Sequence, residues 1–107
     1  MLKERQIMVV VKEPGKGARI EPLFENTLEA FQKAVGGYIE TISVRDDLVL
    51  IVNEEGLIAG LPYNTSVLGL GLVGTVVAAG VRGDEFASLK GSLIAPVLDL
   101  LGRDDDD

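Results

Sequence analysis

Two short stretches in the middle of the chain carry the residues best suited to bind a ligand. Tyr63 and Asn64 follow a proline and offer a phenol and an amide, which form directional hydrogen bonds. The segment 69–74, GLGLVG, comes next, and its glycines leave backbone N–H groups accessible to an anion. Binding residues concentrate on loops above a rigid scaffold, so we expect a ligand site here that includes Gly69 and Gly71. The alternative is that Asn64 only stabilises a turn through its own backbone.

An anionic ligand would also need a positive charge at this site. A guanidinium group supplies that charge and forms paired hydrogen bonds to carboxylate or phosphate groups. Three arginines in the body of the chain are candidates, namely Arg19, Arg45 and Arg82. We predict that Arg45 or Arg82 lies beside Tyr63 and Asn64.

The segment 69–74 also matches the G-x-G-x-x-G pattern of dinucleotide-binding proteins. That pattern binds a cofactor between a strand and a helix, with an acidic residue ~20 positions further on. Here Gly74 is followed by β-branched residues that favour a strand, and Ile94 occupies the acidic position. We therefore predict that the segment binds neither NAD nor FAD, and we expect no cofactor.

The residue types that dominate enzyme active sites are scarce. The chain has no cysteine and no histidine, which removes the thiolate nucleophile, the usual general base and the usual zinc ligand. Glu54 and Glu55 are expected at the tip of a turn, where adjacent side chains point apart. Asp84 and Glu85 have no further oxygen ligands in register for a cation. We predict no catalytic residue and no metal site, so the protein is not expected to be an enzyme.

Charge and hydropathy narrow the range of partners. The net charge is −7, of which residues 104–107 supply four negative charges, and lysine and arginine form no cluster. Nucleic-acid-binding proteins normally carry a basic face, so we expect no direct nucleic-acid binding. The longest clean apolar run, 67–81, has fifteen residues, fewer than the ~20 of a spanning helix. The apolar run 7–11 is too short for a signal peptide, and we expect a cytoplasmic protein without a membrane segment.

The N-terminal half predicts two strands, a helix and a third strand. Residues 6–12 (QIMVVVK) form an apolar run that favours a strand buried on both faces. A Pro-Gly turn leads to a second, antiparallel strand at 18–22. Asn26 suits a helix N-cap and the pair Gly36-Gly37 a helix end, and a strand at 38–44 follows.

The C-terminal half is organised around a predicted β-hairpin. Residues 48–52 (LVLIV) and 57–61 (LIAGL) form its strands, and Gly56 supplies the positive φ that the turn between them needs. A further strand is expected at 74–81 and a helix at 92–101, capped by its first residue, a serine. A proline inside that helix should kink it or delay its start.

The predicted order of elements is β-β-α-β-β-β-β-α. Short connections favour antiparallel neighbours, so we predict an α+β fold. It is a single two-layer domain over residues 1–102, with a mostly antiparallel sheet, one main helix on a face and a short C-terminal helix. Residues 103–107 are expected to form a disordered acidic tail, because adjacent like charges repel.

Several of these segments together resemble a known family. They are the runs 13–15 (EPG), 26–32 (NTLEAFQ), 35–40 (VGGYIE), 53–56 (NEEG), 60–64 (GLPYN), 73–77 (VGTVV) and 83–86 (GDEF). As a set, these runs resemble DUF3846, a family of short uncharacterised proteins of bacteria, phages and mobile elements. The resemblance implies a small accessory protein and brings no catalytic residue with it.

Two classes of function follow. The first is a non-catalytic small binding protein that holds an anionic ligand at the site described above, with a homo-oligomer interface as one place for the pocket. If the protein is phage-borne, as the resemblance implies, that ligand would be a nucleotide-like immune signal, and binding would sequester it. The second is an interaction module of anti-restriction or anti-defence type. It would inhibit or regulate a host enzyme through an exposed sheet edge or an acidic face.

Overall fold

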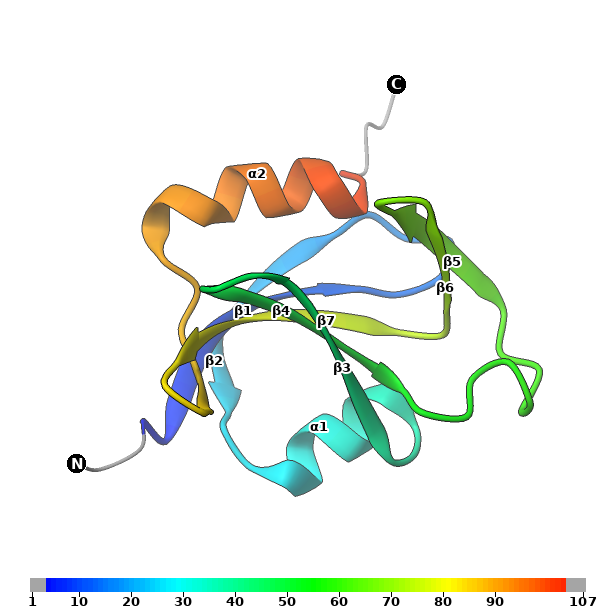
Figure 1. The fold of residues 1–107 in the computed structure, drawn as a ribbon, viewed down its shortest axis with the longest axis horizontal. Helices are drawn as coiled ribbons and strands as arrows, with labels where there is room; N and C mark the ends of the chain where they lie inside the picture. The colour runs from blue at the N-terminus through cyan, green and yellow to red at the C-terminus, as the bar shows by residue number, and fades with distance from the viewer. Residues whose placement is uncertain (1–3, 104–107) are drawn as a thin grey trace.

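The computed structural model describes residues 4–103, and its centre is an antiparallel β-sheet (Figure 1). Five strands follow one another across this sheet in the order β2-β1-β7-β4-β3, and a short further strand, β8, pairs with β7. The strands are β1 (Gln6–Lys12), β2 (Arg19–Glu25), β3 (Ile39–Arg45), β4 (Leu48–Asn53), β7 (Val76–Arg82) and β8 (Glu85–Ala87). A separate hairpin consists of β5 (Tyr63–Val67) and β6 (Leu70–Val73). The helices are α1 (Leu28–Val35) and α2 (Gly91–Leu101).

Both faces of the sheet are covered, and each has its own apolar core. On one face, Phe31 and Val35 of α1 cluster with inward residues of β1, β4 and β7. On the other face, Leu93, Val97 and Leu101 of α2 cluster with the sheet and with the β5–β6 hairpin. The predicted α+β class, with a mostly antiparallel sheet and a C-terminal helix, is confirmed. The structure adds a layer to the two we expected, because α2 lies on the face opposite to α1 (Figure 1).

The strands β1, β7 and β4 form the interior of the sheet, and almost all of their residues are buried. The sequence predicted such a strand at 6–12, and the bounds of β1 match it. Aromatic rings extend the core beneath α1. The ring centroid of Phe31 lies 4.8 Å from that of Phe24 and 4.9 Å from that of Phe86. These contacts tie β2 and β8 to α1.

The N-cap of α1 is Thr27, one residue later than predicted. Its hydroxyl accepts a hydrogen bond at 3.1 Å from the backbone N–H three residues further on. Asn26 is buried instead, and its side-chain amide donates to the carbonyls of Glu4 and Phe86. That long-range contact joins the start of the chain to β8, and a local capping pattern does not reveal it. The helix ends as predicted at Gly36, whose φ of 81° is left-handed.

The hairpin predicted over residues 48–61 is wrong in its second half. β4 forms as expected, but residues 54–60 are a series of turns, and no strand forms at 57–61. β4 already pairs with β3 on one side and with β7 on the other, so a return strand would find no free edge. Gly56 also lacks the positive φ that we predicted. A glycine suits that position because a Cβ there would lie 2.8 Å from Val73 Cγ2.

The C-terminal helix differs from its prediction at its start. α2 begins at Gly91, ahead of the predicted cap at Ser92, and Lys90 precedes it without a side-chain capping bond. The helix contains Pro96, which has no N–H to donate to the Ser92 carbonyl, and the start of the helix is not delayed by it. None of the helices within residues 4–103 has the length and apolar character that a membrane span requires. Of the acidic tail predicted at 103–107, residues 104–107 lie outside the described part of the chain.

Candidate binding surface

Tyr63 and Asn64 lie in a strand and not in the open loop that the sequence predicted. They belong to β5, which turns tightly into β6 at Leu68 and Gly69. These two turn residues have φ values of 54° and 81°, as a two-residue type I′ hairpin turn requires. Gly71 is itself paired across the hairpin. The glycine-rich segment is therefore paired β-structure and not a flexible loop of free N–H groups.

Asn64 is a buried residue that fastens the hairpin to the sheet. Its side-chain Nδ2 donates to the backbone carbonyls of Lys12 and Gly74, each at 2.7 Å. These bonds join the base of the hairpin to the end of β1 and to the segment that leads into β7. The Asn64 Oδ1 atom is buried too, and it has no hydrogen-bond partner among the described residues. The amide thus faces the interior, away from a ligand in solution.

The two predicted arginines lie at the other end of the sheet from Tyr63. Arg82 follows Gly74 by eight residues, most of them in β7, which is about 26 Å at the ~3.3 Å rise of a strand. Arg45 ends β3 beside the first residue of β4, and the register of β4 with β7 places it at the Arg82 end. Tyr63 itself is 61% exposed, with its hydroxyl 2.8 Å from that of Ser66. The structure therefore does not bring these arginines to Tyr63 and Asn64 at the base of the hairpin.

Arg45 takes part in a charged cluster at its own end of the sheet. Asp47, in the turn between β3 and β4, lies 2.7 Å from Arg45 Nε and 3.0 Å from Lys90 Nζ. Lys90, followed by Arg45, holds the pKa of the Asp47 carboxyl below its usual value. Because Lys90 immediately precedes α2, the cluster joins the β3–β4 turn to the start of the helix. Both cations are already paired, which makes them poorer partners for an anionic ligand.

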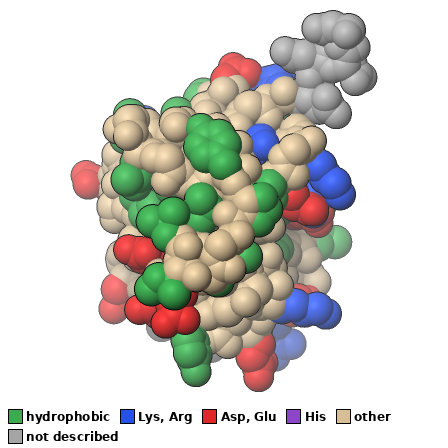
Figure 2. All heavy atoms as spheres, turned by 90° about the vertical axis from the view of Figure 1, so that its right-hand side faces the viewer, with side chains coloured by type: hydrophobic (Ala, Val, Ile, Leu, Met, Phe, Trp, Pro, Cys, Tyr) green, Lys and Arg blue, Asp and Glu red, His purple; other side chains and the backbone are tan. Residues whose placement is uncertain are grey.

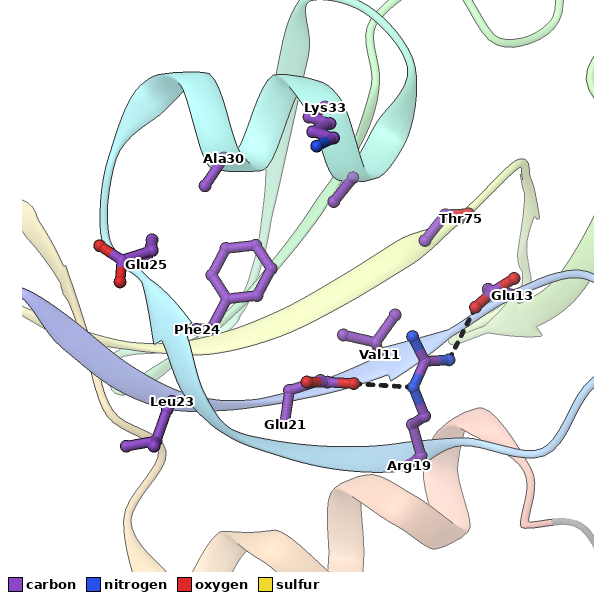
Figure 3. Close-up of a pocket in the computed structure, with 11 residues that line it drawn as sticks. Val11, Glu13, Arg19, Glu21, Leu23, Phe24, Glu25, Ala30, Lys33 and Thr75 are labelled. Carbon is purple, nitrogen blue, oxygen red and sulfur yellow. Dashed lines mark hydrogen bonds and ion pairs between the residues drawn. The ribbon is translucent and has the colours of Figure 1, made fainter.

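A groove of about 570 Å³ lies between β2 and α1 (Figure 3). Arg19 lines it, and its guanidinium lies 2.8 Å from Glu13 and 2.9 Å from Glu21. The hydrogen bond from Arg19 lowers the pKa of the Glu13 carboxyl. Glu25 and Lys33 also line the groove, so three carboxylates accompany two cations. The sequence analysis named Arg19 as a candidate but not the carboxylates that neutralise its charge. Glu13 comes close to Arg19 only when the turn between β1 and β2 has formed.

Exposed apolar side chains gather at the end of the molecule that carries the hairpin (Figure 2). Leu57 and Ile58, in the turns after β4, are 80% and 87% exposed. The hairpin contributes three more exposed residues, Tyr63, Leu68 and Leu70. We call these five residues the apolar surface.

The two parts of the apolar surface are neighbours in space. Leu57, Ile58 and Leu70 line one hollow of about 340 Å³, although they come from different segments of the chain. Glu54 and Glu55 border the same hollow and give it an acidic rim. The signal in the sequence was the absence of charge between residues 56 and 81. The comparison with a membrane span considered only residues 67–81 of this run. It did not predict that the uncharged residues form an exposed surface.

These features define a small antiparallel α+β domain with an apolar surface at one end. Within the described residues, no group of three or more candidate metal ligands comes together. The chain belongs to the DUF3846 family, a domain of unknown function whose sequence profile matches residues 6–102. This match confirms the resemblance seen in the sequence. No curated protein and no solved structure matches the chain.

Proposed function

We propose that this protein is a non-catalytic interaction module that binds a partner protein through the apolar surface. The observation that carries the proposal is the exposure of Leu57, Ile58 and Leu68, each of which is 78% exposed or more. Apolar residues that are exposed singly are common on soluble proteins. A contiguous group with polar residues around it is typical of a protein–protein interface.

The exposed residues contribute little to the protein's own core. The inward side of the hairpin is filled by Val67 and Leu72, which are buried against α2 and the sheet. Leu68 and Leu70 point away from that core, and so the hairpin carries more apolar surface than folding requires. Apolar side chains kept on an outer surface favour aggregation unless a partner covers them. We infer that a partner does so.

The acidic rim indicates what kind of partner would fit. Glu40, Glu54 and Glu55 border the same hollow as the leucine and isoleucine side chains. The whole chain carries a net charge of −7. A partner with an apolar centre and basic side chains around it would match both features, since complementary rim charges speed association and exclude wrong partners.

The alternative function, sequestration of an anionic nucleotide-like ligand, has less support. Arg45 and Arg82 lie far from Tyr63 and Asn64, and Arg19 is paired with two carboxylates. An interaction module that inhibits or regulates a host enzyme in the cytoplasm explains the apolar surface and needs no cationic pocket. It is the function that we propose.

Photo-crosslinking at Leu57 tests this proposal. A photoreactive phenylalanine analogue at position 57 should capture one discrete protein in cells of the natural host. The same analogue at Glu29, an exposed position on α1, is the matched control and should not capture that protein. Adding I58D to the first variant should abolish the adduct, while circular dichroism shows an unchanged fold. The proposal fails if positions 57 and 29 capture the same proteins, or if the adduct survives I58D.

A further inference from the structure

The two outer strands of the sheet differ in how well their edges are protected. β2 contains Pro22 and three charged residues, and a bulge interrupts its pairing with β1. Such features block the addition of another strand. β3 has no proline, and its middle residues Thr41, Ile42 and Ser43 are uncharged. Its own register shift lies at the end of the strand, between Ser43 and Arg45, so residues 39–43 pair regularly with β4. Among residues 4–103, β4 is the only strand that pairs with β3, so the other edge of β3 carries no strand from this part of the chain.

Alternate residues of β3 direct their backbone groups to this open edge. The N–H of Glu54 donates to the carbonyl of Tyr38. The register of β3 with β4 places these two residues opposite each other, so they form a hydrogen-bonded pair. Such positions alternate along an antiparallel pair, so the even-numbered residues of β3 bond to β4. The backbone N–H and C=O groups of the odd-numbered residues point to the open edge instead. These residues are Ile39, Thr41 and Ser43.

We propose that this edge pairs antiparallel with β3 of a second copy of the chain, about a two-fold axis at Thr41. In that register Thr41 lies opposite its own counterpart, and Ile39 lies opposite Ser43. The outward-facing residues can then exchange both of their main-chain hydrogen bonds. Glu40 lies opposite Ile42, so like charges do not face each other directly. This inference goes beyond the proposed function and does not rest on it.

The side chains of β3 suit such a pairing. Four of them are β-branched and favour a strand, namely Ile39, Thr41, Ile42 and Val44. Ile42 and Val44 also line a hollow of about 120 Å³ together with Leu68 and Leu70 of the hairpin. The strand of the second copy would lie beside this hollow, and its apolar side chains would add hydrophobic contact to the main-chain bonds.

The self-complementary edge is what favours a second copy over a different protein. The residue on the proposed axis is uncharged, small and exposed, so it can lie against itself without repulsion. The net charge of −7 on each copy opposes association at long range. Because salt screens that repulsion, the dimer should become tighter as the salt concentration rises. A contact held mainly by ion pairs would become weaker.

Sedimentation equilibrium on the wild type and on charged variants of Thr41 tests the pairing. The wild type should dimerise as its concentration rises. T41K and T41E should each be monomeric, because like charges would meet on the two-fold axis. An equimolar mixture of the two should recover a heterodimer, since opposite charges then face each other. T41V keeps the backbone N–H and adds no charge, so it is the control and should dimerise like the wild type.

The inference is overturned if the wild type stays monomeric at about 1 mM, where even a dimer with millimolar Kd would be extensively formed. It is also overturned if T41K and T41E dimerise alone, or if their mixture gives no heterodimer while both are folded by circular dichroism. A β3 edge that crosslinks to a different host protein in place of a second copy would overturn it as well. None of these results affects the capture of a partner at position 57, so failure here leaves the proposed function standing.

Discussion

Replacing Asn64 by alanine removes a buried amide that joins the hairpin to two strands of the sheet, and we expect a strong loss of stability. The amide donates to the carbonyls of Lys12 and Gly74 at 2.7 Å. Asn64 is only 9% exposed, so water cannot readily take the place of the amide at these two carbonyls. Alanine would leave both acceptors buried without this donor.

The size of the effect follows from what an unmade buried hydrogen bond costs. That cost is ~1–3 kcal/mol for each neutral group. The carbonyls keep a second lone pair, and the unpartnered Oδ1 is removed along with the amide, so a value near the lower end is appropriate. Two bonds then amount to about 3 kcal/mol. In a domain of this size, 1 kcal/mol shifts Tm by about 4 °C or slightly more, and the expected fall in Tm is roughly 12 °C.

Thermal and urea unfolding followed by circular dichroism would measure this loss. Tyr63→Phe is the matched control, because it removes only an exposed contact with Ser66 and should leave Tm within about 2 °C. Asn64→Asp should be worse than alanine at neutral pH, since a carboxylate would face two carbonyl oxygens. Burial would raise the pKa of the new carboxyl in the folded state, so its stability should rise as the pH falls. If Asn64→Ala melts within about 2 °C of the wild type, the structural role is refuted and Asn64 is again a ligand candidate.

Three further predictions concern other parts of the fold. Gly80→Ala should cost about 2 kcal/mol or more, because a Cβ there would lie 2.3 Å from the Ser88 carbonyl oxygen, whereas Gly91→Ala meets open space and should leave the thermal melt unchanged. The pKa of Asp47 is lowered from 3.8 by folding, so its carboxyl stabilises the protein above that pH and this contribution disappears as the pH falls below it. Urea unfolding of Asp47→Asn should therefore show a shallower acid decline than the wild type, and an identical decline would contradict the ion pairs. Ile58→Asp should leave Tm within about 2 °C and reduce aggregation in light scattering, because that side chain is 87% exposed.

The elements that depend on neighbouring residues were predictable from the sequence. β1 was predicted with its observed bounds, because an unbroken apolar run rich in β-branched residues is typical of an interior strand. The end of α1 at Gly36 was predictable because glycine readily adopts the left-handed φ that a helix end requires. The strand predicted at 57–61 failed for a non-local reason. β3, which directly precedes β4, occupies one edge of β4, and β7, from a distant part of the sequence, occupies the other. The local pattern of residues 57–61 does not reveal that both edges are taken.

The candidate site was only partly predictable, and the reason is again distance along the chain. The sequence pointed to the segment that matters, because the hairpin at 63–73 carries much of the apolar surface. We had expected Asn64 to bind a ligand, but its two acceptors lie 52 and 10 residues away in the sequence. Spacing alone does not show that these carbonyls will converge on the amide. The position of Arg82, in contrast, follows from the predicted strand at 74–81, which ends just before it and so places it far from Gly74.

The buried amide of Asn64 holds in place the hairpin that carries part of the apolar surface. A two-stranded hairpin is marginally stable by itself, and β5–β6 is held in place by Asn64 at its base and by Val67 and Leu72 on its inner side. Leu68 and Leu70 are thereby held outward, where they stay exposed. A surface fixed in this way loses less conformational entropy when a partner binds. Asn64→Ala should therefore weaken partner capture at position 57 even well below its Tm, and capture that is unchanged would mean that the hairpin keeps its position without the amide.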